Sequence, residues 1–217
     1  AELHRPIRQI WITEPLGAPE HPFLRDGGYT PAHCERQAII NADAIVAPDQ
    51  NDRCDVIEDM AFDPADLPSF LATLQESAAK YPRGSLSLEP VQWSASRLQD
   101  AAARLKDRGG SQITAIARDV SGKPVGLAEV AKFENDADSV AEIGLVYVRE
   151  ANRGLGLGKR ALASAISAAL SIWPQTKQIY ASYPNPQPGA SHILDHYAPT
   201  GISQATAWQK GVPKLDS

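Results

Sequence analysis

The sequence predicts an α/β (α+β) fold in which helices flank one mixed sheet, and three observations support this. Two helical segments come first, between residues 66 and 110. Three β-rich runs separated by short polar turns follow between residues 112 and 148, a spacing typical of an antiparallel meander. The remaining residues alternate between helical and strand-like segments, which makes the sheet a mixed one.

The first 53 residues predict a β segment followed by a linker. Strands fit residues 7–13 and 35–40, with a stretch rich in proline and glycine between them, and residues 42–53 are polar and turn-prone. We therefore expect two units: an N-terminal segment over residues 1–53 and a larger domain over residues 54–217.

Two helices are predicted before the meander. Asp66 is placed to cap a helix over residues 67–80, and Pro68 falls in its first turn, where the missing N–H costs little. A second helix fits residues 94–106, whose apolar side chains recur at helical spacing: Leu98, Ala101, Ala102 and Leu105.

The later elements follow in order. Meander strands are predicted over residues 112–118, 124–133 and 139–148. A helix rich in alanine and leucine fits residues 159–172. A strand over 177–183, a short helix over 191–197 and a final strand over 201–208 complete the prediction.

Composition narrows the classes of function. The 217 residues are 43% hydrophobic and carry a net charge of −5, which disfavours a nucleic-acid partner because neutralising phosphates needs a basic face. No apolar run reaches the roughly 20 residues that span a membrane. Cys34 and Cys54 have the spacing of neither a metal site nor a disulfide framework. We expect a cytoplasmic protein with no metal and no membrane or nucleic-acid partner.

The most informative segment joins the third meander strand to the following helix. It is VREANRGLGLGKRAL, residues 148–162, in which Arg153 precedes three alternating glycines and Lys159 follows them. A glycine-rich turn between a strand and a helix leaves backbone N–H groups unpaired at the helix N-terminus, and here two cationic side chains flank them. Such a turn is suited to binding phosphate.

Spacing distinguishes three kinds of phosphate loop. A Walker loop fails because Lys159 is followed by arginine and because Arg153 stands where its first glycine is needed. A dinucleotide loop fails because Lys159 occupies the place of its third glycine. The third pattern, R-x-x-G-x-G, is met by Arg153, Gly156 and Gly158. The alternative without a ligand is that the glycines only make a tight turn.

The third pattern resembles the pyrophosphate loop of the GNAT acyltransferases. The resemblance extends to Val148, five residues before Arg153, and to the segment from Tyr197 to Ile202, which is similar to the family's Y-x-x-x-G-F with isoleucine in place of phenylalanine. It implies a GNAT-like, mostly antiparallel sheet and acetyl-CoA as the co-substrate. It also implies the residues that bind this co-substrate: Leu145, Val146, Tyr147, Val148, Arg153, Gly154, Leu155, Gly156, Leu157, Gly158 and Lys159.

Catalytic residues also follow from the resemblance. Acyl transfer to an amine needs a base for the amine's proton and benefits from an acid for the leaving thiolate. Glu142 matches a position where some GNAT enzymes carry a catalytic glutamate, and Glu129 is the alternative base. Tyr197 is the predicted acid, although the asparagine that the family often has seven residues earlier is Ala190 here. The competing interpretations are that Glu142 faces solvent and that Tyr197 packs in the core.

The N-terminal segment looks like a compressed copy of the C-terminus. Residues 10–13 are followed by proline, glycine and a polar strand in the order found after residues 179–182. Together with the resemblance, this implies that residues 1–41 are the tail of an earlier module, as in two-module actinobacterial GNAT proteins. The remaining chain is then the C-terminal module, and its partner is a missing N-terminal module or a second copy in a homo-oligomer.

The sequence as a whole favours an N-acyltransferase. It would move an acetyl group from acetyl-CoA to a primary amine by direct transfer in a ternary complex. The acceptor stays open between a small-molecule amine and a protein amine. The alternative is a non-catalytic acyl-CoA-binding or regulatory module.

Overall fold

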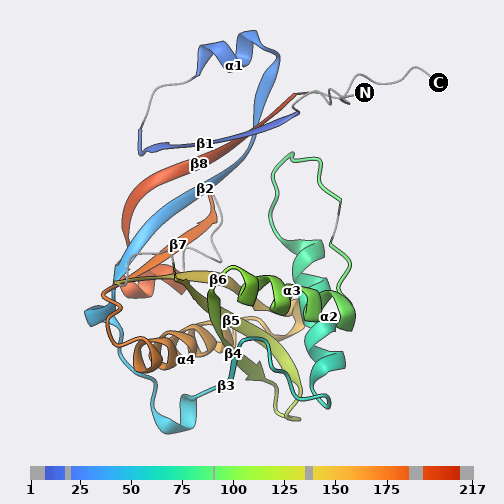
Figure 1. Ribbon diagram of the computed structural model, residues 1–217, viewed down its shortest axis with the longest axis vertical. Helices are drawn as coiled ribbons and strands as arrows, with labels where there is room; N and C mark the ends of the chain where they lie inside the picture. The colour runs from blue at the N-terminus through green and yellow to red at the C-terminus, as the bar shows by residue number, and fades with distance from the viewer. Residues whose placement is uncertain (1–7, 18–20, 90, 135–138, 186–192, 211–217) are drawn as a thin grey trace, which may run out of the picture.

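The computed structural model describes residues 8–17, 21–89, 91–134, 139–185 and 193–210 (Figure 1). The strands are β1 (Gln9–Pro15), β2 (Tyr29–Asn41), β3 (Asp55–Glu58), β4 (Gly110–Arg118), β5 (Pro124–Phe133), β6 (Val140–Val148), β7 (Gln178–Pro184) and β8 (Thr200–Lys210). The α-helices are α1 (Pro22–Asp26), α2 (Leu67–Lys80), α3 (Ala95–Asp107) and α4 (Leu157–Ile172). Among the described residues, no helix is both long enough and apolar enough to cross a membrane.

The strands form one sheet in the order β1-β8-β2-β7-β6-β5-β4-β3. In the described part of the chain, β6 and β7 run parallel and every other neighbouring pair is antiparallel. The three meander strands are direct neighbours, as the short polar turns between them predict. The predicted mixed, mostly antiparallel sheet with flanking helices is therefore confirmed.

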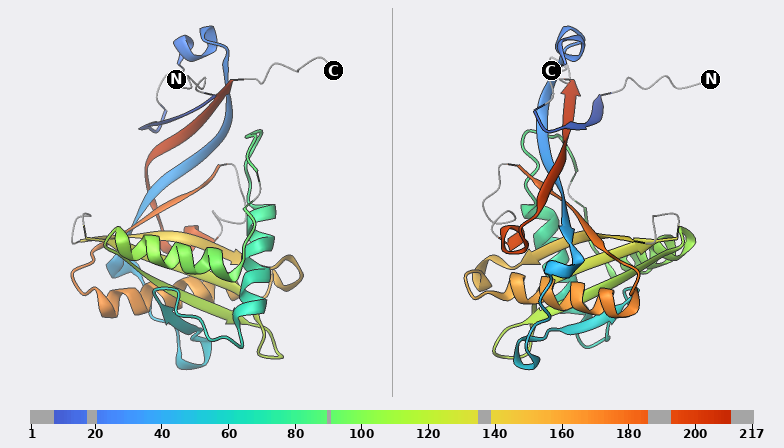
Figure 2. Two further views of the ribbon diagram at one scale, coloured as in Figure 1. Left: turned by 45° about the vertical axis from the view of Figure 1, so that its right-hand side comes forward. Right: turned by 90° about the vertical axis from the view of Figure 1, so that its left-hand side faces the viewer.

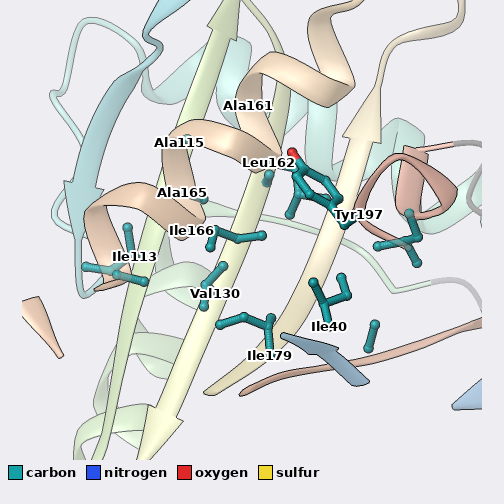
Figure 3. Packing of buried hydrophobic residues seen from close by; sticks show 14 of the residues in the cluster. Ile40, Ile113, Ala115, Val130, Ala161, Leu162, Ala165, Ile166, Ile179 and Tyr197 are labelled. Atoms are coloured by element: carbon teal, nitrogen blue, oxygen red, sulfur yellow. The ribbon is translucent and has the colours of Figure 1, made fainter. Parts of the chain in front are cut away.

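Helices cover both faces of this sheet (Figures 1 and 2). The larger core lies between α4 and one face (Figure 3). Its fully buried members include Ile40, Ile113, Val130, Leu162, Ile166 and Ile179. The smaller core lies between the other face and the helices α2 and α3, and it contains Phe70, Leu74, Leu98, Ile116 and Leu127. Side chains on opposite faces of a central strand therefore pack in different cores: on β5, Val130 lies in the larger core and Leu127 in the smaller one.

The ends of α2 are as predicted and those of α3 lie one residue later than predicted, but the predicted capping contact of Asp66 is not formed. Ser94 caps α3, since its hydroxyl accepts a hydrogen bond from the Arg97 amide at 3.2 Å. Asp66 stands at the N-cap of α2 without a side-chain capping bond. Its carboxylate instead accepts two hydrogen bonds from the Arg118 guanidinium, at 2.8 and 2.5 Å. The capping prediction was wrong because this β4 arginine engages both carboxylate oxygens.

Two short elements have no counterpart in the sequence prediction. The strand β3 is held by pairing with β4, and α1 has five residues, so neither has the length that makes a pattern recognisable. The short helix predicted over residues 191–197 lies partly outside the described residues. Within them, Asp195–Tyr197 form a 3-10 turn.

The N-terminal strands are built into the same sheet as the rest of the chain. β2 lies between β7 and β8, and β1 lies outside β8. β2 and β8 twist together away from the helices α2, α3 and α4 (Figure 2), yet Ile40 near the end of β2 is fully buried in the larger core (Figure 3). The division of the chain at residue 53 stays a prediction, and so does the derivation of residues 1–41 from an earlier module.

Candidate functional site

An irregularity in β6 forms the centre of the candidate site. The pairing of β5 with β6 shifts by one residue, so that Gly144 and Leu145 together face Glu129. A β-bulge of this kind bends its strand. The parallel pairing of β6 with β7 ends at Ile143 and Ala181. Beyond these residues the two strands are no longer joined.

A cavity of about 560 Å³ lies between the unpaired parts of β6 and β7. Its wall includes Tyr81, which follows α2 on one side of the sheet, and Gly158 and Leu194 on the side of α4. Because residues from both sides of the sheet line the cavity, it runs through the gap between the strands. The glycine-rich loop lies at one end of it.

The loop has the backbone conformation that its glycines predict. Gly154 and Gly156 have φ values of +80° and +74°, in the left-handed region that favours glycine. Among the described residues, none beyond the chain neighbours of each glycine has an atom within 4 Å of the place where a Cβ at either position would be. Gly156 is the N-cap of α4, and no side chain of the described residues caps this end. The first-turn amides of α4 therefore remain available to an anion.

Two cations accompany these amides. The Nε of Arg153 donates a hydrogen bond to the Val148 carbonyl at 3.0 Å, and its guanidinium lies 5.5 Å from the centre of the Tyr147 ring. Lys159 is in the first turn of α4 and lines the cavity. The positive end of the helix dipole and both side chains make this end of the cavity electropositive.

The structure brings the predicted cofactor-binding residues together. All of them line the cavity except Leu155, which is 68% exposed. Gly144, Ser182 and Tyr183 also line it and were not predicted. These three residues line the cavity only because β6 diverges from β7, and no local sequence pattern indicates this divergence.

Glu129 lies beside the bulge. It is half-buried, and a Cβ built on Gly144 would lie 3.4 Å from its Oε2, so its carboxylate adjoins a residue of the cavity wall. Burial raises the pKa of Glu129 to about 7, although hydrogen bonds from the Leu145 amide and the Gln112 side chain favour the charged form. A carboxyl group with a pKa near neutrality is suited to accept and release a proton.

Glu142 lies two residues before the bulge, on the same face of the sheet as Glu129. It pairs with Ala131 of β5 and Tyr180 of β7 and is half-buried. Its negative charge is one of the causes, after burial, that raise the pKa of Tyr180. Glu142 is not among the described residues that line the cavity, and neither is Glu129, whose carboxylate adjoins the lining residue Gly144. The role of Glu142 as the base stays a prediction.

Tyr197 is 5% exposed and belongs to the larger core, together with Ala161 and Leu162 of α4 (Figure 3). Burial raises the pKa of its hydroxyl. The structure does not place Tyr197 among the cavity-lining residues, although Leu194 of the same segment lines the cavity. The role of Tyr197 as an acid stays a prediction. Ala190, which stands where the family often has asparagine, lies outside the described residues.

A second group of polar side chains, called here the acidic end, consists of Ser182, Tyr81 and Glu35; Lys80, which pairs with Glu150, also lines the cavity. Ser182 of β7 and Tyr81 line the cavity, and their hydroxyls donate hydrogen bonds to the carboxylate of Glu35, at 2.8 and 3.4 Å. Desolvation of its hydroxyl raises the pKa of Tyr81, and the Glu35 charge raises it further. No sequence motif predicts this group, because its three members come from distant segments of the chain.

Comparison with known proteins identifies a family. A model of the acetyltransferase (GNAT) family matches residues 72–186, which is more than half of the chain. A search of curated proteins finds no match.

Solved structures share the fold. A tandem GNAT protein from the clavulanic acid biosynthesis pathway has a TM-score of 0.64 at 13% identity, covering 95% of this chain and 65% of that chain. A GCN5-related N-acetyltransferase from Sphaerobacter thermophilus has a TM-score of 0.54 at 13% identity, covering 94% and 62%. A phosphinothricin acetyltransferase from Sinorhizobium meliloti, in complex with AcCoA, has a TM-score of 0.51 at 16% identity, covering 76% and 91%. The chain thus spans less than two thirds of the first two proteins.

Proposed function

The chain belongs to the acetyltransferase (GNAT) family, and on that premise we propose that it is an N-acyltransferase. In this proposal it transfers an acetyl group from acetyl-CoA directly to a primary amine of a small molecule or a protein, within a ternary complex. The observation that carries the proposal is the cavity between β6 and β7. It connects the glycine-rich loop with the acidic end formed by Glu35, Ser182 and Tyr81.

The loop fits the diphosphate of coenzyme A. The space over Gly154 and Gly156 is open, and the first turn of α4 offers amide donors beside Lys159. Past the bulge, β6 has no pairing with β7, so backbone groups of residues 145–148 are left for an extended ligand. Acetyl-CoA, when bound, supplies the activated thioester.

The protein's own groups supply the proton chemistry. Glu129 accepts the proton that the acceptor amine must lose before it attacks, directly or through one water molecule. The pKa of about 7 lets Glu129 be ionised at neutral pH and still hold a proton once it is transferred. Because Tyr197 lies in the core, we assign it a packing role and not that of the acid.

We extend the proposal to the organisation of the chain. Residues 54–217 form the acyl-CoA-binding domain of a cytoplasmic protein, the C-terminal module of a two-module arrangement. Residues 1–53 supply β2 to its sheet. A preceding module or a second copy would be the partner.

Release of coenzyme A in the presence of primary amines tests the proposal. The full chain is incubated with acetyl-CoA and a panel of amine classes, and the free thiol is measured. We expect release that depends on the amine and is lost in Glu129→Gln, while titration calorimetry shows unchanged coenzyme A binding. Absence of coenzyme A binding would refute the proposal.

A second candidate function is a non-catalytic acyl-CoA-binding module. The burial of the family-matched tyrosine, Tyr197, away from the cavity favours it. Coenzyme A binding without thiol release for any amine of the panel would support this function and contradict the enzyme.

A further inference from the structure

We infer that Glu35, on the N-terminal strand β2, is a specificity-determining residue that selects acceptors carrying a second cationic group. The inference rests on the proposed function and deepens it, because it names the class of acceptor: a diamine or polyamine. Four observations lead to it: the contacts of Glu35, the nature of its ion-pair neighbour, its distance from the bulge and the way its neighbours are fixed.

The contacts of Glu35 place its carboxylate directly behind the cavity wall. One oxygen accepts a hydrogen bond from Ser182 at 2.8 Å, and the other accepts one from Tyr81 at 3.4 Å. Both donors line the cavity. A ligand at this end would therefore meet two hydroxyls that are already oriented by a carboxylate.

The ion-pair neighbour of Glu35 is a histidine and not a strongly basic residue. The glutamate side chain is 20% exposed, and His33 lies 3.4 Å away, with a charge that depends on its protonation. Among the described residues, no lysine or arginine forms an ion pair with Glu35. A half-buried carboxylate in such surroundings is stabilised by an incoming cation.

The sheet order separates Glu35 from the reacting centre. β7 lies between β2 and β6, and neighbouring strands are about 4.8 Å apart, so β2 lies about 10 Å or more from the bulge. Glu129 on β5 and Glu35 on β2 therefore lie on opposite sides of the cavity, each on the strand behind its wall. Glu129 can receive the proton of the reacting amine. Glu35 can interact with a second cationic group farther along the same acceptor.

The segment that carries Tyr81 is fixed to the strands β2 and β8. The Ser85 amide donates to the Ala32 carbonyl of β2 at 2.8 Å. The Ser87 amide donates to the Gln209 side chain of β8, also at 2.8 Å. The acidic end is therefore a built part of the fold and not a chance approach of side chains.

Calorimetry on the full chain saturated with coenzyme A tests the inference. The probes share a six-carbon chain: the sixth carbon bears a second ammonium in hexamethylenediamine, is a methyl in hexylamine and is a carboxylate in aminocaproate. We expect the wild-type protein to bind the diamine about tenfold or more tightly than hexylamine, and aminocaproate most weakly. Glu35→Gln should remove the preference for the diamine. The matched control Glu58→Gln changes an exposed glutamate on β3 and should keep it.

The outcomes distinguish failure of this inference from failure of the proposed function. A wild-type protein that binds coenzyme A but does not prefer the diamine would overturn the inference and leave the proposed function intact. Retention of the preference in Glu35→Gln would overturn it as well. If Glu35→Gln does not fold, the wild-type ranking of the diamine over aminocaproate decides, and a reversed or absent ranking contradicts the inference. Failure of coenzyme A to bind would overturn both proposals.

Discussion

The two ends of the cavity are built in contrasting ways. The loop end is one contiguous segment, from Arg153 to Lys159, whose backbone amides and cations suit an anion. The acidic end draws Glu35, Tyr81 and Ser182 from three separate segments, which only the sheet and the end of α2 bring together. An anion site at a helix N-terminus is thus encoded locally, whereas the acceptor side depends on tertiary structure.

Replacement of Glu129 should have the largest effect. Glu129→Gln removes the proposed base, so we expect turnover to fall about a hundredfold or more at pH 8, with unchanged affinity for coenzyme A. In the wild type, turnover should fall about tenfold per pH unit below a pKa of about 7, because protonated Glu129 cannot accept a proton. A pH–rate profile of both proteins measures this.

The matched variant is Glu142→Gln, which changes the other predicted base on the same face of the sheet. It should keep the pH dependence of the wild type. Should Glu142→Gln lose this dependence while Glu129→Gln keeps it, the assignment of the base would have to be exchanged.

Glycine substitution should separate ligand binding from backbone strain. Gly156 and Gly122 both have positive φ values, +74° and +82°, and at neither position would an added Cβ lie within 4 Å of a described residue beyond the adjacent ones in the chain. Alanine at either position should lower the free energy of unfolding by roughly 1–2 kcal/mol. We expect Gly156→Ala alone to weaken coenzyme A binding, by about tenfold, because only Gly156 adjoins the first turn of α4. Equal affinities in the two variants would mean that the loop does not hold the diphosphate.

A smaller effect is expected for Lys159→Ala. Loss of one partly solvated cation should weaken coenzyme A binding about threefold to tenfold at low ionic strength, and less at high salt. The matched control is Lys106→Ala, at an exposed position near the end of α3. Calorimetry at two salt concentrations measures the difference, and a salt-independent effect of Lys159→Ala would contradict an electrostatic role.

The smallest effect is expected for Tyr197→Phe. Its ring belongs to the larger core and its hydroxyl lies outside the cavity lining, so turnover should change less than about twofold. A loss of tenfold or more, with unchanged melting temperature, would restore the acid role that the sequence predicts.

The fold could be predicted where the pattern is local. Alternation and polar turns define the meander, and the helix α2 spans the residues that its flanking aspartate and proline indicate. The short β3 could not be predicted, because it depends on its pairing with β4. The insertion of β2 between β7 and β8 is likewise a matter of pairing partners, which a single sequence does not reveal.

In the candidate site, too, local features could be predicted and features that depend on tertiary structure could not. Gly154 and Gly156 could be identified from spacing, and their positive φ values explain why glycine stands there. The burial that raises the pKa of Glu129 could not be identified, because it depends on tertiary packing around β5; the bulge residue Leu145 contributes an amide hydrogen bond that lowers this pKa. Glu35 carries no sequence signal at all, since its significance comes from two hydroxyls that lie 46 and 147 residues away in the chain.

A crystal structure of the full chain with coenzyme A tests the central claim most directly. We predict the diphosphate on the amides of residues 157–159, with the thiol end between β6 and β7 beside Gly144. A ligand bound elsewhere, or a gap closed by pairing of β6 with β7 beyond Ile143, would contradict the account.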